Sequence, residues 1–440
     1  MASRQGNATS KSASIPRRAS WKRDLATYLE IDRGRSLGQI ASVVLPYLGV
    51  WVLASILRPN AWLAIGLGLV ATVFLMRMYS LFHDLTHNSL FESRAANTRW
   101  GYVLGFLLFT PYRWWQRQHS LHHAHTGNLD ERGPGEIYTM TLAEYESAPW
   151  WRRLGYRAYR NPLLMLLVGP SLVFLFERRF PQRGMSRRIL LSVVLTNLAL
   201  AAWALGWSAL VGWQTFLAIQ GTTLVAGGAI GAWMLYIQHQ YEGTYYQSSG
   251  DWRFELAALQ GSSFLKLPHA LAWAVGNANY HHVHHLSARI PNYRLRAAHD
   301  EQPMFARTPV VTVRGSINAL RLKLWDEERE SLGRFPGRRG RFGRGSAHPR
   351  GLRGLSVLVR APRRVPWAQI RTAVGARRVR SARARRRSGG SGARMQTPRS
   401  GSVRQSPLRE ARLRVRPARA PLPRAAGWAA AGRGSRRPLR

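Results

Sequence analysis

The chain has 440 residues, enough for one large domain or two smaller ones, and it contains no cysteine. The absence of cysteine excludes disulfides, thiolate zinc sites, iron–sulfur clusters and a cysteine nucleophile, so a bound metal must be held by nitrogen and oxygen. The formal net charge is +44, and residues 331–440 contribute 31 arginines, no lysine and one acidic residue, Glu410. We therefore interpret residues 1–330 and the arginine-rich remainder separately.

The first 20 residues are polar, which predicts disorder rather than a secretory signal. Four apolar runs follow, at about 39–57, 62–79, 189–208 and 213–235, and each is close to the ~20 residues that a membrane-spanning helix needs. We predict an all-α integral membrane fold in which these runs form two transmembrane hairpins. Shorter apolar runs at about 101–112 and 162–176 are predicted to lie in the membrane interface, or, for the second, to re-enter the membrane.

Three histidine clusters read H-D-L-T-H, H-S-L-H-H and H-H-V-H-H, and on a helix each spacing places its imidazoles on one face. A further histidine, His239, follows the last apolar run and is predicted to lie at the same depth as the three clusters. An ionisable group at the end of a membrane helix is usually functional. Eight clustered imidazoles exceed the three or four ligands of one zinc ion and match two metal ions in a shared site. The predicted metal ligands are His83, His87, His119, His122, His123, His239, His281, His284 and His285.

The clusters can share metal ions only if they lie on one side of the membrane. Each predicted hairpin returns the chain to its starting side, so the two hairpins satisfy this condition. Basic residues are frequent before residue 36 and between 177 and 188, whereas the predicted outer loops near 58–61 and 209–212 carry only Arg58. By the positive-inside rule, the clusters form a histidine-rich cap that faces the cytoplasm.

A ligating histidine needs an acceptor for its other ring N–H, and the candidates in this sequence are Asp84, Asp130, Glu242 and Asn277. Two histidines beside the clusters, His125 and His282, are predicted to point away from the metals because of their angular position on a helix. We expect the remaining histidines to be ordinary surface or packed residues, namely His269, His299 and His348.

Two other metal sites fit the sequence less well. The first cluster is H-D-x-x-H rather than the H-E-x-x-H of zinc peptidases, and a single zinc site leaves the other two clusters unexplained. A carboxylate di-iron bundle needs paired glutamates and Glu-x-x-His motifs, which this chain does not have. The pattern therefore favours a membrane-embedded, histidine-rich, non-haem dinuclear site.

These three boxes, in this order and with apolar hairpins between them, resemble the membrane-bound fatty acid desaturases and their hydroxylase relatives. Finer matches resemble the delta-12 (omega-6) acyl-lipid branch, and the whole resemblance covers about residues 20–330. They are Leu129-Asp130-Glu131-Arg132-Gly133, Gln238-His239-Gln240-Tyr241-Glu242, Leu265-Lys266-Leu267-Pro268, and His284-His285-Leu286 with Ile290-Pro291-Asn292-Tyr293.

The resemblance implies two iron ions, molecular oxygen as co-substrate, an acyl-lipid substrate and a cis double bond as product. It leaves hydroxylation open as an alternative outcome on the same scaffold. Because no electron-transfer motif is present, it also implies a separate ferredoxin or cytochrome b5-like donor. We expect a bacterial inner-membrane location, and the basic stretch with Arg178, Arg179, Arg187 and Arg188 is a candidate surface for an acidic donor.

The sequence thus divides into a disordered start (1–20), a membrane desaturase domain (21–330) and a low-complexity tail (331–440). The tail shows no helical or strand periodicity, and it is predicted to be disordered. Arginine without lysine favours the interpretation that the tail is GC-rich DNA translated in a shifted reading frame. A tail that binds anionic lipid or nucleic acid and an extension without function remain alternatives, although no nucleic-acid partner is expected.

Overall fold

The fold is described from a computed structural model that places residues 18–133 and 135–336. The predictions of disorder for residues 1–17 and for the tail beyond residue 336 lie outside these described residues. A short helix, α1 (Arg18–Asp24), begins inside the segment that the sequence predicted to be disordered. It leads through the 3₁₀ turn η1 (Ala26–Leu29) into the first long helix.

Within residues 18–133 and 135–336, four helices are long and apolar enough to cross a membrane: α2 (Arg33–Leu57), α3 (Ala61–His87), α9 (Arg187–Val211) and α10 (Trp213–His239). They contain the four predicted runs and confirm the fold class. Asp32, Asn60 and Ser186 cap α2, α3 and α9 by accepting a hydrogen bond from a backbone N–H of the first turn. Each helix is longer than its apolar run, so the polar ends of α3 and α10 extend beyond the span.

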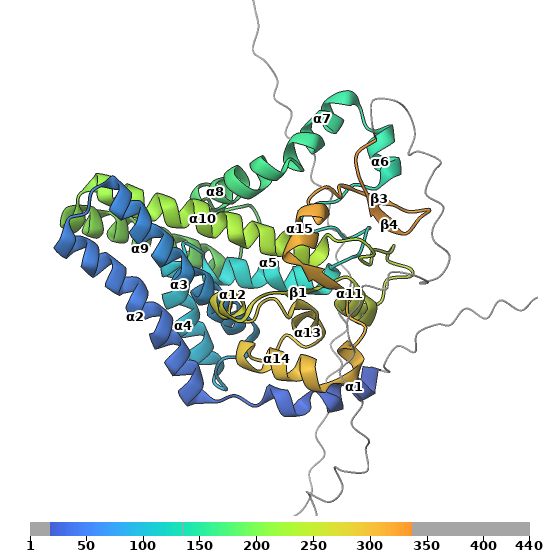
Figure 1. The fold of residues 1–440 in the computed structure, drawn as a ribbon, viewed down its shortest axis with the longest axis horizontal. Helices are drawn as coiled ribbons and strands as arrows, with labels where there is room; N and C mark the ends of the chain where they lie inside the picture. The colour runs from blue at the N-terminus through green and yellow to red at the C-terminus, as the bar shows by residue number, and fades with distance from the viewer. Residues whose placement is uncertain (1–17, 134, 337–440) are drawn as a thin grey trace, which may run out of the picture. The chain divides into compact units, whose positions relative to one another are not determined.

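The centre of the bundle is the contact between α3 and α10, with α2 packed on α3 and α9 packed on α10 (Figure 1). Gly68 permits this approach, because a Cβ at this position would lie 2.9 Å from the carbonyl oxygen of Ile219. Leucine and isoleucine side chains on the outside remain exposed, including Leu45, Ile56 and Leu205. Such an outer surface suits contact with lipid hydrocarbon.

Two further segments are helical but too short or too bent to count among the four. The helices α4 (Arg94–Leu107) and α5 (Tyr112–His125) form a hairpin whose turn places Phe109 at a φ of 54°. The helix α7 (Trp150–Tyr159) meets the following helical segment, Leu164–Arg179, at 64°, as a broken span or a re-entrant loop would. That segment consists of η2 (Leu164–Val168), α8 (Gly169–Leu175) and η3 (Glu177–Arg179).

The arginines of η3 bind this hairpin turn. Arg178 donates to the hydroxyl of Thr110 at 3.1 Å, and Arg179 donates to the carbonyl oxygen of Phe109 at 2.6 Å and to Asn197 at 3.1 Å. They supply hydrogen bonds to a turn that would otherwise leave polar groups in apolar surroundings. Arg178 and Arg179, which the sequence suggested for a donor-binding surface, are half-buried and engaged in these hydrogen bonds.

The remaining elements form a cap at the ends of α3 and α10 that carry histidine. Two pairs of short strands join the cap: β1 pairs with β2 in parallel, starting with Phe264 opposite Val310, and β3 pairs with β4 antiparallel. The elements are α6 (Leu142–Ser147), α11 (Phe254–Gln260), β1 (Phe264–Lys266), α12 (His269–Ala274), α13 (His281–Leu286), α14 (Asn292–Glu301), η4 (Pro303–Phe305), β2 (Val310–Thr312), α15 (Val313–Ala319), β3 (Leu324–Asp326) and β4 (Ser331–Gly333).

A fully buried arginine, Arg160, fastens the cap to α10. Its guanidinium donates to the Tyr236 hydroxyl at 3.1 Å and to the Gln240 side chain at 2.8 Å, and also to the carbonyl oxygens of Tyr138 and Leu322. Among the described residues no carboxylate pairs with it, so the cation is held by neutral oxygens alone. These bonds fix the residue that follows His239 and thereby the end of α10.

Gly101→Ala tests the close packing of the α4–α5 hairpin. A Cβ at Gly101 would lie 2.7 Å from Cζ of the buried Tyr112 ring, whereas at Gly38, in α2, nothing lies within 4 Å. We expect Gly101→Ala to destabilise the protein by about 1–3 kcal/mol, as overpacking does. Gly38→Ala, which only improves helix propensity, should leave stability equal or higher. Thermal unfolding in detergent measures both variants, and equal transition temperatures would contradict the packing described.

Candidate metal centre

Four helices bring the predicted ligands together. His83 and His87 lie on the last turns of α3, and His239 is the last residue of α10. The second cluster lies on α5 and the third on α13. The ends of two membrane helices, one hairpin helix and one helix of the cap therefore meet at one place, although the chain between the first and third clusters is almost 200 residues long.

The nine imidazoles form two groups, and within each group one ring nitrogen of every residue lies within 4.8 Å of those of the others. The first group is half-buried except for His284, and the second is fully buried. The groups adjoin, because the rings of His123 and His285 stack at 4.2 Å. The first group contains His83, His87, His119, His123 and His284, and the second contains His122, His239, His281 and His285.

The positions of the ring nitrogens suit ligation of a metal ion better than hydrogen bonds between the rings. Nε2 of His284 lies 2.9 Å from Nε2 of His123, and Nε2 of His281 lies 3.0 Å from Nε2 of His239. Two nitrogen lone pairs at this distance repel unless a proton or a metal ion lies between them. Among the described residues, four ring nitrogens of the two groups are buried without a hydrogen-bond partner: Nε2 of His87, His122 and His285, and Nδ1 of His284. A metal ion in each group would bind these donors, and an all-nitrogen set suits iron, zinc, copper or nickel.

Burial also holds these side chains in the ligating form. It lowers the pKa of His281, His284 and His285 well below the usual range, and neighbouring imidazoles lower it further. The same causes lower the pKa of His122 and His123 on α5. The rings are therefore neutral at physiological pH, and a neutral imidazole is the form that binds a metal ion.

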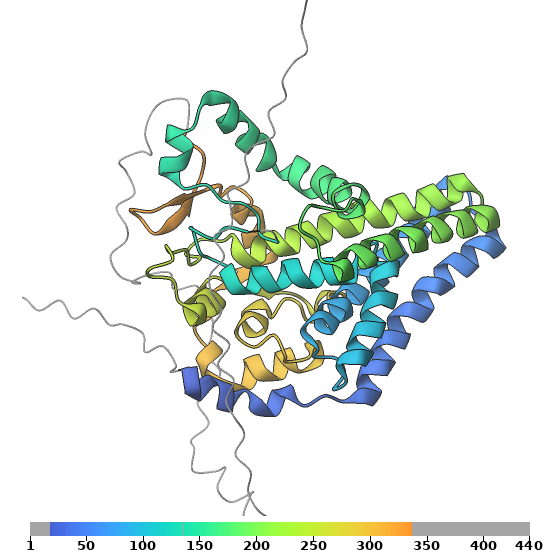
Figure 2. The same cartoon turned by 180° about the vertical axis from the view of Figure 1, so that it is seen from behind.

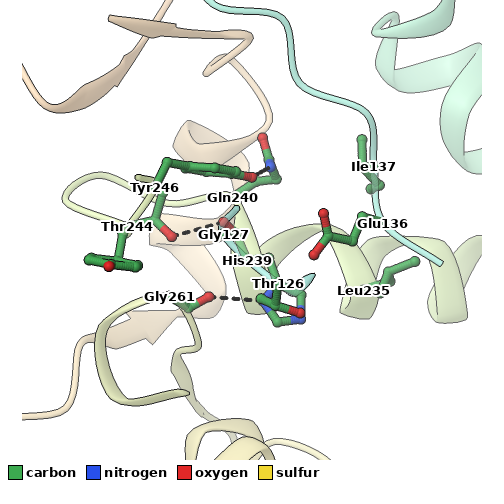
Figure 3. Close-up of a pocket in the computed structure, with 11 residues that line it drawn as sticks. Thr126, Gly127, Glu136, Ile137, Leu235, His239, Gln240, Thr244, Tyr246 and Gly261 are labelled. Atoms are coloured by element: carbon green, nitrogen blue, oxygen red, sulfur yellow. Dashed lines mark hydrogen bonds between the residues drawn. The ribbon is translucent and has the colours of Figure 1, made fainter. Parts of the chain in front are cut away.

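The backbone fixes the orientation of His239. Its Nδ1 lies 2.8 Å from the carbonyl oxygen of Gly261 (Figure 3). A carbonyl only accepts hydrogen bonds, so Nδ1 carries the proton and Nε2 presents its lone pair to the second group. This backbone acceptor comes from the loop after α11, and the sequence analysis did not identify it.

An acidic residue that the sequence analysis missed, Glu136, lies beside the second group. Its carboxylate oxygen is 3.7 Å from Nδ1 of His122, and burial raises its pKa to about 8. Figure 3 shows it on the loop beside α10, in the surroundings of Thr126 and His239. Glu136 lies in an irregular loop, where no periodicity could mark it. The one available signal was an acidic residue closely following the second cluster.

The four acceptors named from the sequence have different environments. Asp84 is buried and lies 3.6 Å from Nδ1 of His83, while its other oxygen accepts from the backbone N–H of Asn292 at 2.7 Å. The other three make no contact with the clustered rings among the described residues. Asp130 accepts from Ser249, Asn277 donates to the carbonyl oxygen of Asn292, and Glu242 is exposed. These three residues were predicted because they lie near the histidine clusters in the sequence. The loops that carry them place their side chains away from the rings.

The histidines predicted to point elsewhere do so. His125 pairs with Glu131 at 2.5 Å, and His282 contacts His299 at 2.9 Å on the side of α13 away from the groups. His269 contacts Arg296 at 2.7 Å. His348 lies outside the described residues.

A cavity of about 760 Å³ begins at the histidine groups and is mostly apolar. His83, His119 and His281 line one end of it. Along α10 the lining extends from Gln238 to Gln220, which corresponds to a length of about 27 Å at 1.5 Å per residue. The opposite wall comes from α3 and from the broken segment η2–α8. The site can therefore bring a long apolar chain against a pair of metal positions.

Comparison with known proteins gives the same assignment. The family model described as fatty acid desaturase matches residues 60–313, more than half of the chain. The chain belongs to the fatty acid desaturase family. It is an oxidoreductase, and the family implies a lipid substrate and a source of electrons.

Individual relatives agree with the family and differ in the position of the double bond. A fatty acid desaturase of Bacillus subtilis is 39% identical over 71% of this chain and 89% of its own length. Two Synechocystis enzymes are more distant. An sn-1 oleoyl-lipid 12-desaturase is 25% identical over 59% of this chain and 72% of its own length. An sn-1 acyl-lipid omega-3 desaturase (ferredoxin) is 27% identical over 60% and 74%. The delta-12 desaturases that the motifs resembled are thus only distant relatives of this desaturase.

His281→Ala tests whether the second group holds a metal ion. We expect the purified desaturase to bind two metal ions per chain and the variant at most one, because the imidazole removed belongs to a four-membered set. The matched control is His125→Ala, whose ring contacts Glu131 outside both groups and whose loss should leave two ions bound. Elemental analysis of both proteins decides. Unchanged metal content in His281→Ala would contradict the site.

Proposed function

We propose that this desaturase is an oxygen-dependent acyl-lipid desaturase that introduces a cis double bond, of the delta-12 (omega-6) type. The two irons would be held by His83, His87, His119, His123 and His284 in one group and by His122, His239, His281 and His285 in the other. The observation that carries the proposal is the apolar cavity that opens directly onto both groups. A methylene chain needs such a cavity, and nine nitrogen donors can hold the two metal ions.

The iron, when bound, supplies the oxygen chemistry that no amino-acid side chain provides for an unactivated C–H bond. The protein's own residues hold the imidazoles in place, bury the second group from solvent and align the acyl chain. One turnover removes two hydrogens from adjacent methylenes. Together with O₂, two electrons and two protons, these hydrogens give two molecules of water and leave one double bond.

The assignment to delta-12 is supported by the sequence motifs and by the cyanobacterial 12-desaturase among the relatives. We further propose that the histidine cap faces the cytoplasm of a bacterial inner membrane, with a ferredoxin or cytochrome b5-like protein as electron donor. Four candidate spans with basic residues near the cap support this orientation. The cyanobacterial relative whose name includes ferredoxin supports an iron–sulfur donor.

Lipid analysis of cells that express the protein tests the reaction. Wild type and the control His125→Ala should both produce new cis-unsaturated chains, whereas His285→Ala, which removes a buried ring of the second group, should reduce them at least 100-fold. Gas chromatography with mass spectrometry locates the double bond. Identical profiles for wild type and His285→Ala would end the proposal, a bond at another position would end the delta-12 assignment, and hydroxylated chains would show the alternative reaction.

Gly231→Leu tests whether the acyl chain lies along α10. Gly231 lines the cavity, and a Cβ there would meet no atom within 4 Å, so a leucine side chain would extend into the open slot. We expect at least tenfold less product from long acyl chains with metal content unchanged. Gly221→Leu, on the same helix and with equally open surroundings, lies outside the cavity lining and should leave the product profile unchanged. Equal profiles for the two variants would place the substrate elsewhere.

A further inference from the structure

We propose that the outer face of α5, together with the adjacent ends of α4 and α9, is the docking surface for an acidic one-electron carrier protein. The inference rests on the proposed function, because each turnover needs two electrons that the chain cannot supply. The surface is defined here as the α5 patch, and its residues are Arg94, Arg117, Arg187 and Arg188.

The helix α5 separates the metal groups from the outside of the protein. On its inner face the buried Trp115 stacks on the ring of His119 at 4.3 Å, and His122 follows one turn later. On its outer face Arg117, Ser120 and Ala124 are exposed at helical spacing. A helix is about 10 Å wide, so a carrier on the outer face would stand one helix diameter from the first histidine group. Figure 2 shows this side of the molecule, with α5 in front.

Two hydrogen bonds of Arg113 hold α4 and α9 against the first turn of α5. Its side chain donates to Thr98 on α4 at 3.3 Å, and its backbone N–H donates to the hydroxyl of Ser192 on α9 at 3.1 Å. Arg94 precedes Thr98 by one turn, and Arg188 precedes Ser192 by one turn. Arg94 and Arg188 therefore lie on the two helices that contact α5, each one turn away from a contact of Arg113, and Arg117 follows Arg113 by one turn.

The charge of the patch is positive and available to a partner. All four arginines are exposed, and among the described residues none of them takes part in an ion pair. The helices α4, α5 and α9 contain no aspartate or glutamate. A surface of one sign steers a partner of the opposite sign to the site and fixes its orientation.

Membrane topology alone does not account for this placement. The positive-inside rule explains basic residues at the ends of spans, such as Arg187 and Arg188 at the start of α9. The same rule covers Arg94, which follows the end of α3 by seven residues. It does not cover Arg117, which lies 30 residues beyond that end, on the helix that carries the second histidine cluster. This position suits delivery of single electrons to the first histidine group.

The test measures desaturation by the full-length protein in nanodiscs with an acidic [2Fe–2S] ferredoxin, kept reduced by its reductase, as the donor. We expect the double variant Arg117→Glu/Arg188→Glu to raise the apparent KM for ferredoxin at least tenfold, with the rate at saturating ferredoxin unchanged. The salt dependence of KM should also become weaker than in wild type. The matched control is Lys22→Glu/Arg23→Glu, which reverses two exposed charges on α1 and should behave as wild type.

In a second arm the protein is reduced without oxygen by dithionite and a small mediator, which need no docking surface; excess reductant is removed, O₂ is admitted, and the product of a single turnover is measured. Equal activity of wild type and patch variant in this arm, with the KM effect present in the first, supports the proposal. An unchanged KM for ferredoxin overturns the proposal. An equal loss of activity in both arms, in nanodiscs of neutral lipid as well as of anionic lipid, also overturns it. No activity of wild type in either arm would instead overturn the proposed desaturation, so the two failures are distinguishable.

Discussion

The structure depends on one constraint: nine imidazoles are packed together, five of them buried, and four of their ring nitrogens are buried without a hydrogen-bond partner among the described residues. Buried polar atoms without partners destabilise a fold, and lone pairs 3 Å apart repel each other. Metal ions bound by these rings would remove both costs at once. The helix ends that carry the rings must therefore meet within a few ångströms, and the rest of the cap is arranged to keep them there.

Several polar contacts serve this arrangement without touching the rings that bind metal. Arg160 ties the end of α10 to the cap through neutral oxygens, so the residue after His239 cannot drift. Arg178 and Arg179 bind the turn of the α4–α5 hairpin. This turn fixes where α5 begins and so where its three clustered histidines lie. Asp84 joins α3 to α14 through Asn292. Loss of any of these would move a helix end rather than remove a ligand.

The same helices line the apolar cavity. Because α3 and α10 approach closely at Gly68 and the segment η2–α8 breaks instead of running straight, a space remains between them that begins at the histidines. The histidine groups, the cavity and the proposed docking surface therefore lie on different sides of the same helices. The two histidine groups lie at the ends of α3 and α10, the apolar cavity follows α10, and the outer face of α5 is exposed.

The sequence by itself determined the four spans and all nine clustered histidines, because helical spacing and apolar length are local properties that survive folding. It also separated His125 and His282 from the clusters, since the angle around a helix is set by residue number. Only the tertiary structure decided which oxygens serve the rings and which arginines face outward. Glu136, the carbonyl of Gly261 and the internal contacts of Arg178 and Arg179 arise from loops and from breaks in helices. In such segments, position along the chain gives no direction in space, and long-range packing sets every contact.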